Sequence, residues 1–222
     1  MGIYEVVVRF FQTGGPFMYP IAVVLVVGLS IALERWLVLT SARVTNRRAF
    51  DVSMGHLRDK NYKSVLAAGK DSNVPMYRIV AAGIARFAGS KRRDDIESAM
   101  EEGVMEALPK LEKRTPYLAT LANVATLLGL LGTIIGLIAA FTAVADAAPT
   151  EKASMLSSSI SVAMNTTAFG LISAIPLLLL HAILQTKTTE IVDSFEMASV
   201  KVLNSLVDAD ALPSYSRETD PA

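Results

Sequence analysis

The chain of 222 residues has no cysteine and only two histidines, His56 and His181, which lie far apart in the sequence. Disulfides, thiolate metal sites and cysteine nucleophiles are therefore excluded, and a histidine-based metal centre has no cluster of ligands. No Asp pair or Ser-His arrangement is evident within the apolar segments, so we predict neither an enzyme nor a cofactor. The formal net charge is zero, and we expect no nucleic-acid partner.

Charged residues are missing from the central part of three long apolar segments, residues 17–39, 118–144 and 158–185. Each segment has about the 20 residues that a helix needs to cross a hydrocarbon core of about 30 Å. The mean hydropathy of +0.42 and the 52% share of hydrophobic residues agree with this pattern. We predict an all-α integral membrane protein with three transmembrane helices.

The distribution of positive charge predicts the orientation. Most Lys and Arg residues lie between Arg43 and Arg114, whereas the loop 145–157 contains Lys152 as its single cation. Positively charged connections stay in the cytoplasm, so the loop 145–157 and the N-terminus are expected outside and the C-terminus inside. Before the first span the chain has only Arg9 as a cation, and the apolar run is long, so cleavage of a signal peptide is not expected.

The remaining segments are assigned by their composition and periodicity. Apolar residues recur at three- and four-residue steps between the first two spans, which predicts helices that extend into a cytoplasmic helical domain. The final segment is short and polar, which is typical of a disordered tail. The expected parts are an interfacial helix at 1–16 on the periplasmic side, the cytoplasmic domain at 40–117, the periplasmic loop at 145–157, a cytoplasmic C-terminal helix at 186–211 and a tail at 212–222.

Small residues in the second span indicate close helix packing. Gly129, Gly132 and Gly136 follow one another at three- and four-residue spacing, and the last two form a GxxxG pair. Small residues at this spacing allow neighbouring helices to approach closely. We expect these glycines, together with Gly170, to pack helices, and we expect Pro176 to kink the third span.

Polar side chains occur in the middle of two spans. Thr133 in the second span and Thr167 in the third lie at similar sequence distances from their shared loop, so both are expected near the bilayer midplane. Ser161, Asn165 and Thr166 add polarity to the third span. Single Ser and Thr residues often bond to their own helix or to a neighbouring helix. Several at one depth on adjacent spans favour an ion route.

A titratable group for this route is absent from the middle of the spans. Glu34 and Arg35 stand at the inner end of the first span, where we expect them to reach the interface or to pair with a neighbouring subunit. His181 lies near the inner end of the third span and is interpreted as a packing residue. A proton-driven channel needs a titratable site in the membrane, so another subunit would have to supply it.

These residues carry a family resemblance. The matching pieces are Glu34-Arg35, the sequence LLGTIIG at 130–136, the sequence TAFGL at 167–171, and the sequence AIP at 174–176. With them the chain resembles the MotA/TolQ/ExbB family of inner-membrane motor channel subunits. Its three spans and outside N-terminus are similar to ExbB and TolQ rather than to the four-span flagellar stator subunit.

The resemblance implies an assembly and a mechanism. A homopentameric ring would surround a dimer of a single-span ExbD/TolR-like partner in the lipid of the bacterial inner membrane. The partner's transmembrane Asp would take up and release the ion, facing Thr133 and Thr167 on the ion route. Ion flow would drive rotation and pass work to a TonB/TolA-like envelope-spanning protein, for envelope transport or motility.

One position departs from the family pattern. ExbB and TolQ usually carry a Glu five residues before the pore threonine, where this chain has Val162. Extra hydroxyls without a carboxylate suit Na⁺ as well as a proton, with Thr133, Thr166 and Thr167 as transient ligands. Val162 also favours an alternative, a non-conducting membrane scaffold of the same fold. An intramembrane enzyme is the third and weakest interpretation.

Overall fold

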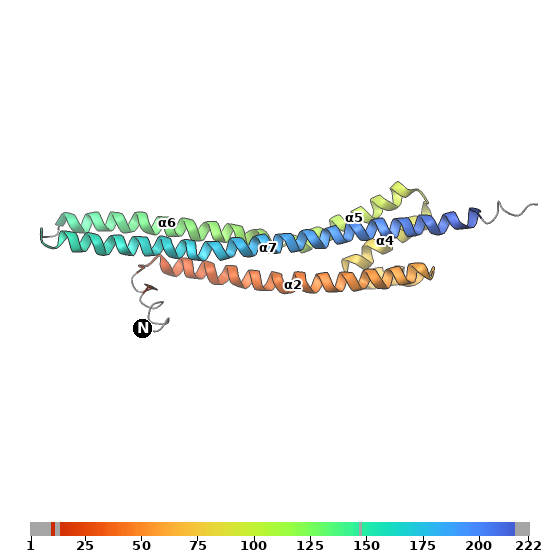
Figure 1. Cartoon of the computed structure of the whole chain (residues 1–222), viewed down its shortest axis with the longest axis horizontal. Coiled ribbons are helices and arrows are strands. Elements are labelled where there is room, and N and C mark those ends of the chain that lie inside the picture. Colours follow the sequence, from red (N-terminus) through yellow and green to blue (C-terminus); the bar gives the residue numbers. More distant parts are fainter. Residues whose placement is uncertain (1–9, 12–13, 147, 216–222) are drawn as a thin grey trace, which may run out of the picture. The chain divides into compact units, whose positions relative to one another are not determined.

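The computed structural model describes residues 10–11, 14–146 and 148–215, and these form helices without a strand among them (Figure 1). The long helices are α2 (Met18–Arg58), α6 (Thr115–Asp146) and α7 (Lys152–Tyr215), and the shorter ones are α3 (Tyr62–Asp71), α4 (Pro75–Gly89) and α5 (Arg93–Glu112). The chain divides into two compact units. The first contains residues 1–35 and 114–184, and the second contains residues 36–113 and 185–222.

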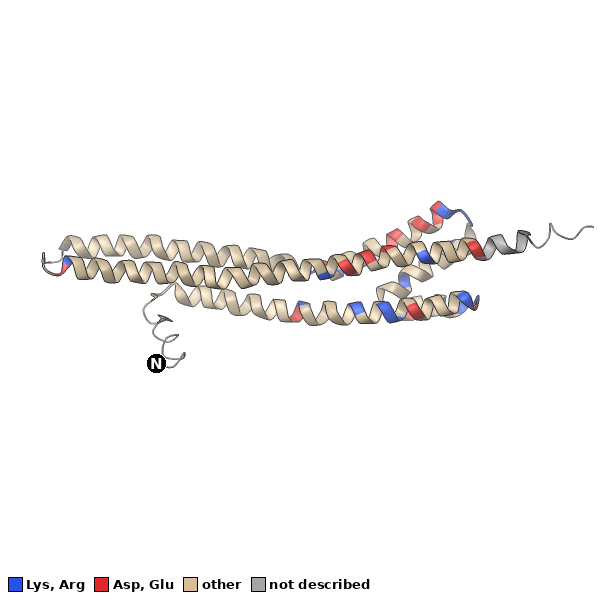
Figure 2. Cartoon of the chain, in the orientation of Figure 1, with Lys and Arg blue, Asp and Glu red and all other residues tan. Residues whose placement is uncertain are grey.

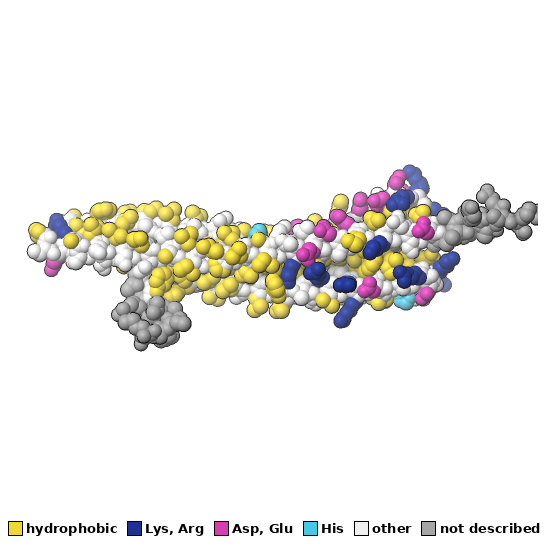
Figure 3. All heavy atoms as spheres, viewed as in Figure 1, with side chains coloured by type: hydrophobic (Ala, Val, Ile, Leu, Met, Phe, Trp, Pro, Cys, Tyr) yellow, Lys and Arg dark blue, Asp and Glu magenta, His cyan; other side chains and the backbone are white. Residues whose placement is uncertain are grey.

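Three helices are long and apolar enough to cross a membrane, which confirms the three predicted spans. They include α2, α6 and α7, whose apolar parts carry almost no charged residues in Figure 2. Large apolar side chains are exposed along them, as Figure 3 shows, and Leu33, Leu127 and Phe141 each expose more than 60% of their surface. Apolar side chains exposed all along a helix are stable in lipid and unfavourable in water.

In the first unit, α6 and α7 lie side by side (Figure 1). Small residues are buried on both helices, among them Ala122, Ala125, Ala163 and Ala174, and Gly136 of α6 lies against Ala163 of α7. The apolar part of α2 joins them through Gly28, where an added Cβ would lie 2.6 Å from a methyl group of Leu177. Small side chains bring helix backbones close together, and van der Waals packing of this kind holds spanning helices in lipid.

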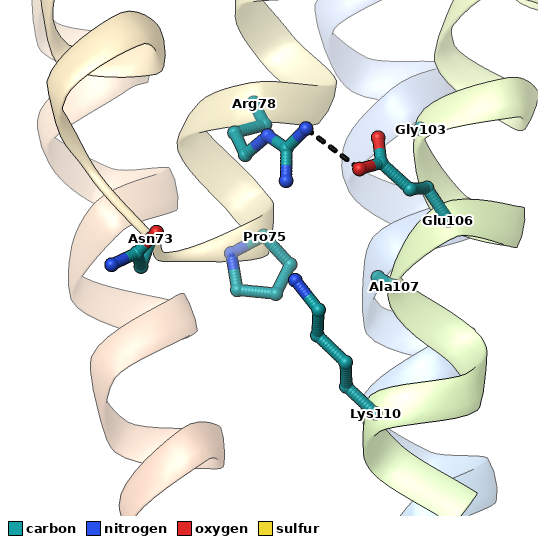
Figure 4. A pocket seen from close by; sticks show the side chains of 7 residues that line it. All are labelled: Asn73, Pro75, Arg78, Gly103, Glu106, Ala107 and Lys110. Carbon is teal, nitrogen blue, oxygen red and sulfur yellow. Dashed lines mark hydrogen bonds and ion pairs between the residues drawn. The ribbon is translucent and has the colours of Figure 1, made fainter.

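The second unit contains α3, α4 and α5 with the later parts of α2 and α7. Its core is built from apolar side chains at helical spacing, including Met76, Ile79, Val80, Ile84, Ile96, Met100, Phe195 and Val202. Figure 4 shows α4 beside α5, where Arg78 pairs with Glu106 at 2.7 Å. The cavity beside this ion pair is about 10 Å³ in volume, which is room for a single water molecule.

The helices extend beyond several of the predicted boundaries. Helix α2 continues past the end of the first span to Arg58, and α7 runs without a break from Lys152 to Tyr215, so residues 212–215 are helical rather than part of a tail. Helix α6 ends at Asp146 and α7 begins at Lys152, so both helices extend into the predicted loop 145–157. Neither junction contains Gly or Pro, so the hydrogen-bonded ladder continues from lipid into water.

Two other expectations stay predictions. Pro176 is exposed inside the continuous helix α7, so the kink expected there would bend this helix without ending it. The interfacial helix predicted for residues 1–16 lies largely outside the described residues.

A buried polar residue ties α2 to α4. Asn46 is 2% exposed, and its side-chain amide donates to the carbonyl oxygen of Ala42 at 2.8 Å. Its side-chain oxygen accepts a bond from the backbone N–H of Met76 at 3.1 Å. Met76 is in the first turn of α4, where N–H groups have no partner within the helix. Asn46 therefore caps α4 from a residue thirty positions earlier.

We expect the Asn46→Ala variant to lose about 1–3 kcal/mol of stability, since the buried N–H of Met76 is left without its acceptor. Hydrogen exchange of the Met76 amide should accelerate, and thermal unfolding in detergent should begin at a lower temperature. Asn73→Ala serves as the matched control, because Asn73 is exposed in the segment before α4. Equal stability of the two variants would contradict the capping role.

Candidate functional site

Two threonine hydroxyls meet in the middle of the contact between α6 and α7. Thr133 on α6 and Thr167 on α7 make a direct hydrogen bond through their Oγ1 atoms. Thr133 Oγ1 lies 3.2 Å from the carbonyl oxygen of Gly129 and 3.3 Å from that of Ala163. Thr167 Oγ1 lies 3.0 Å from the same oxygen of Gly129. The structure thus brings together the two threonines expected at one depth.

The number of protons in this cluster limits what it does. Each hydroxyl has one proton to donate and two lone pairs to accept with. One hydroxyl donates to the other, and the second donates to the carbonyl oxygen of Gly129 or Ala163, so lone pairs remain on both Oγ1 atoms. Such oxygens accept a hydrogen bond from a protonated carboxyl group, or replace part of the hydration shell of a small cation. They do not take up a proton themselves near neutral pH.

The backbones of α6 and α7 lie close together, and this allows the hydroxyls of Thr133 and Thr167 to bond to the opposite helix. A Cβ on Gly170 would lie 2.8 Å from the carbonyl oxygen of Ala125 and 3.0 Å from the Cα atom of Gly129. A Cβ on Gly129 would lie 3.3 Å from the Cα atom of Thr167. Gly136 lies against Ala163 in the same contact, where an added Cβ would be 3.0 Å from the alanine Cβ. These glycines therefore lie in the α6–α7 contact.

Thr166 has different neighbours. Its hydroxyl donates to the carbonyl oxygen of Gly14 at 2.6 Å and lies 3.0 Å from that of Val162. The side chain is 2% exposed, and its methyl group fills the space that a Cβ on Gly132 would occupy. The structure therefore separates Thr166 from the other two threonines and gives its hydroxyl a packing role between α7 and the segment before α2.

The other polar candidates on α7 differ in their exposure. Asn165 is half-buried and Ser161 is exposed. Val162 is half-buried and faces Gly15, where an added Cβ would lie 3.1 Å from Val162 Cγ1. An apolar contact thus occupies the position at which the family resemblance led us to expect Glu.

Charged residues gather at the end of the first span. Glu34 pairs at 2.7 Å with Arg114 of the same chain, and Arg114 directly precedes α6. Arg35 is 3% exposed, so its guanidinium is covered by the protein rather than by solvent. Sequence analysis did not find Arg114 as the partner of Glu34, since eighty residues separate them and only the fold brings them together. His181 is half-buried on α7.

Two further features were missed by sequence analysis. The ring of Phe169 lies edge-on to those of Phe10 and Phe11, with centroids 6.1 and 4.9 Å apart. Ser173 is fully buried on α7, and its hydroxyl has no hydrogen-bond partner among the described residues. Its seven-residue spacing from Thr166 places both on one helical face. That spacing is the signal that could have identified Ser173 as a buried polar position.

The described residues hold no group of three His, Asp or Glu side chains suited to a metal ion. The oxygen atoms around Thr133 and Thr167 are neutral hydroxyl and carbonyl groups. Neutral oxygens of this kind bind alkali cations weakly and briefly. This donor set fits an ion in passage and does not fit a resident transition metal.

Comparison with known proteins identifies the family of this chain. The sequence model of the MotA/TolQ/ExbB proton channel family matches residues 71–197 of this chain. The chain is 30% identical over 162 residues to the Tol-Pal system protein TolQ of Haemophilus influenzae, covering 68% of this chain and 70% of that protein. It is 27% identical over 203 residues to a putative biopolymer transport protein ExbB homolog of Methanothermobacter thermautotrophicus. The match covers 89% of this chain and 69% of that protein.

A third relative is the biopolymer transport protein ExbB of Aquifex aeolicus, 32% identical over 111 residues that cover 50% of this chain and 72% of that protein. The family match includes both threonines and the glycines that pack against them, so the resemblance based on these motifs is confirmed. This membrane chain belongs to the MotA/TolQ/ExbB proton channel family.

Proposed function

We propose that this chain is the ion-conducting ring subunit of a membrane motor. In this proposal a pentamer surrounds a dimer of an ExbD/TolR-like single-span protein, whose transmembrane Asp carries the ion past Thr133 and Thr167. Ion-motive force is converted into rotation of the ring relative to the dimer. A TonB/TolA-like envelope-spanning protein receives the work and uses it for transport or motility.

The observation that supports this proposal most directly is the hydroxyl pair of Thr133 and Thr167. One proton lies in the bond between the two hydroxyls, and the other has a carbonyl oxygen within 3.3 Å, so lone pairs remain on both Oγ1 atoms for an incoming group. A protonated Asp donates to such an acceptor, and an ionised Asp holds Na⁺ against it. Gly129 O completes the proposed ligand set, and Thr166 is left out because its hydroxyl donates to Gly14.

The need for a partner follows from the residues within the spans. Glu34 and Arg35 lie at one end of the first span, and Glu34 is already paired with Arg114. The second and third spans contain no Asp, Glu, Lys or Arg. A titratable group is needed for proton transfer across the hydrocarbon core. The Asp of the single-span partner supplies it in this proposal.

Assembly into a ring is supported by a largely apolar groove in the second unit. The groove between α5 and α7 has a volume of about 510 Å³. Its apolar lining residues are Met100, Val104, Met105, Leu108, Val192, Val200 and Leu203, and its polar ones are Glu97, Glu101, Glu196 and Ser199. Met105 exposes 70% of its surface, although this unit lies outside the apolar spans. Exposed apolar surface away from lipid is typical of a protein–protein contact.

We place the chain in the bacterial inner membrane with the second unit in the cytoplasm. Support comes from the concentration of Lys and Arg in that unit, because positively charged segments remain on the cytoplasmic side. The N-terminus is then periplasmic, and the 147–151 loop is on the same side.

Ion uptake into proteoliposomes tests the proposal. The full chain is reconstituted with its single-span partner, and uptake is measured separately under a proton gradient and a sodium gradient. We expect flux under at least one gradient and its loss when the partner's Asp is changed to Asn. The ion that produces Asp-dependent flux is the coupling ion.

A non-conducting scaffold is the competing function, and Val162 supports it. Packed against Gly15, Val162 leaves the third span without the carboxylate that relatives usually carry. An intact complex that conducts neither ion, even with its envelope-spanning partner present, would favour the scaffold over the channel.

A further inference from the structure

We infer that the second unit contains a binding site for the headgroup of an anionic phospholipid, at the end of the spans where the helices leave the membrane. The site is formed by Arg43 and Arg47 on α2 with Ser194 on α7. These three residues line one cavity of about 380 Å³. The inference does not depend on the ion route, since it concerns only the surface next to the membrane.

The position of the cavity along the helices is the first argument. Arg43 and Arg47 follow the last apolar residue of the first span, Leu39, by four and eight residues. At about 1.5 Å per residue they lie roughly 6 and 12 Å beyond the hydrocarbon edge. The headgroup layer is about 5–8 Å deep on each side of the core. Arginine side chains extend several ångströms back toward the membrane, so both guanidinium groups reach this layer.

The charges at this level favour an anion. Residues 40–48 of α2 and 185–190 of α7 together contain four cations and one anion. The cations are Arg43, Arg47, Arg48 and Lys187, and the anion is Glu190. Basic pockets between spanning helices at the cytoplasmic side bind anionic lipid headgroups. Phosphate fits guanidinium groups especially well, because their N–H groups form paired hydrogen bonds with its oxygens.

The local ion pairs leave capacity for a phosphate. Arg43 pairs with Glu190 at 3.0 Å, with 64% of the arginine side chain exposed. Arg47 also lines the cavity, and no ion pair to it occurs among the described residues. Asp51 and Lys201 also line the cavity. Ser194 donates its proton to the carbonyl oxygen of Ile191 at 2.6 Å, so it contributes shape to the wall rather than a donor.

The surface beside the cavity suits the rest of a lipid. Trp36 and Leu37 expose 41% and 61% of their surface one to two turns before Arg43, on the membrane side. The Lys187 ammonium lies 3.2 Å from the centre of the Trp36 ring and 3.3 Å from Thr40 Oγ1. Tryptophan is enriched at the membrane interface. An apolar surface for the acyl chains thus leads directly to the cationic cavity for the phosphate.

The test uses the full chain purified in a mild detergent and titrated with phosphatidylglycerol or phosphatidylcholine, with bound lipid counted by native mass spectrometry. We expect phosphatidylglycerol to bind at least about tenfold more tightly than phosphatidylcholine, since each cation near the surface contributes measurably to binding of anionic lipid. The Arg43→Gln/Arg47→Gln variant should lose this preference. The Arg47→Gln variant keeps the Arg43–Glu190 pair. The logarithm of its affinity ratio, phosphatidylglycerol over phosphatidylcholine, should be about half that of the native chain.

The matched control is Arg58→Gln/Lys60→Gln, which removes two cations from the far end of α2 and should keep the preference within about twofold. Wild-type binding by a folded Arg47→Gln variant would overturn the inference. So would equal binding of both lipids by the native chain. Displacement of phosphatidylglycerol by millimolar inorganic phosphate would also overturn it, because the site would then bind soluble phosphates. Ion flux enters none of these outcomes, so failure here is distinguishable from failure of the motor.

Discussion

Replacing Thr133 and Thr167 together by Val should reduce Asp-dependent ion flux by at least about a hundredfold while the complex still assembles. Valine keeps the shape of threonine but removes both hydroxyl oxygens that face each other between α6 and α7. Each hydrogen bond to a charged or strongly polar group is worth about 1.5–3 kcal/mol. Losing two of them raises the barrier by at least about 3 kcal/mol, which corresponds to about a hundredfold in rate.

Control substitutions separate the route from the general polarity of α6. Thr126 and Thr142 donate to carbonyl oxygens four residues earlier in their own helix, Ala122 and Ile138. The Thr126→Val/Thr142→Val variant should therefore conduct within about threefold of the native complex, since it disturbs no contact with α7. Flux is measured in proteoliposomes under the gradient that drives the native complex. Native flux in the Thr133→Val/Thr167→Val variant would exclude these threonines from the route.

A methyl group at Gly170 should destabilise the first unit by about 1–3 kcal/mol, the usual cost of overpacking a tight contact. Its new Cβ would lie 2.8 Å from the carbonyl oxygen of Ala125 and 3.0 Å from the Cα atom of Gly129. Both are backbone atoms, so neither moves aside by a change of rotamer. The Gly170→Ala variant must instead push α7 away from α6, which also lengthens the bond from Thr167 to Gly129 O.

Gly55 provides the opposite case. It is an exposed residue inside α2, and a Cβ added there meets no atom within 4 Å. Gly55→Ala should increase stability by about 0.5–1 kcal/mol, because alanine restricts the unfolded chain more than glycine does. Thermal unfolding in detergent compares the two variants, and flux shows whether the threonine contact survives. If Gly170→Ala unfolded no earlier than the native protein, the close approach of α6 and α7 would be wrong.

The two proposals for this chain use different surfaces and respond to different substitutions. The ion route depends on Thr133 and Thr167 in the first unit. The lipid site depends on Arg43 and Arg47 in the second. Flux should therefore respond to the threonine variants, and the preference for phosphatidylglycerol should respond to the arginine variants.

The sequence by itself determined the fold class and the location of the spans. An apolar run of about 20 residues has few stable alternatives to a spanning helix, because lipid satisfies none of its backbone polar groups. The same local logic indicated Thr133 and Thr167, since depth in a membrane follows from counting residues along a helix. The motifs around them were specific enough to identify the family.

Helix lengths were predicted less well where no local signal marks a boundary. Composition changes from apolar to polar near Leu39 and Gln185, yet α2 and α7 continue through both points. Hydropathy records the change of solvent, whereas the helix ends where hydrogen bonding and capping end. A change of environment and the end of an element are therefore different events in this chain.

Only the tertiary structure decided which polar groups are partners. Sequence analysis grouped Thr166 with Thr133 and Thr167, but the rotation of α7 directs Thr166 to Gly14 and leaves the other two facing each other. The pairs Glu34–Arg114 and Asn46–Met76 are separated by eighty and thirty residues, so no local pattern records them. Depth and polarity are properties of one helix, but a hydrogen bond depends on how two helices are rotated and how closely they pack.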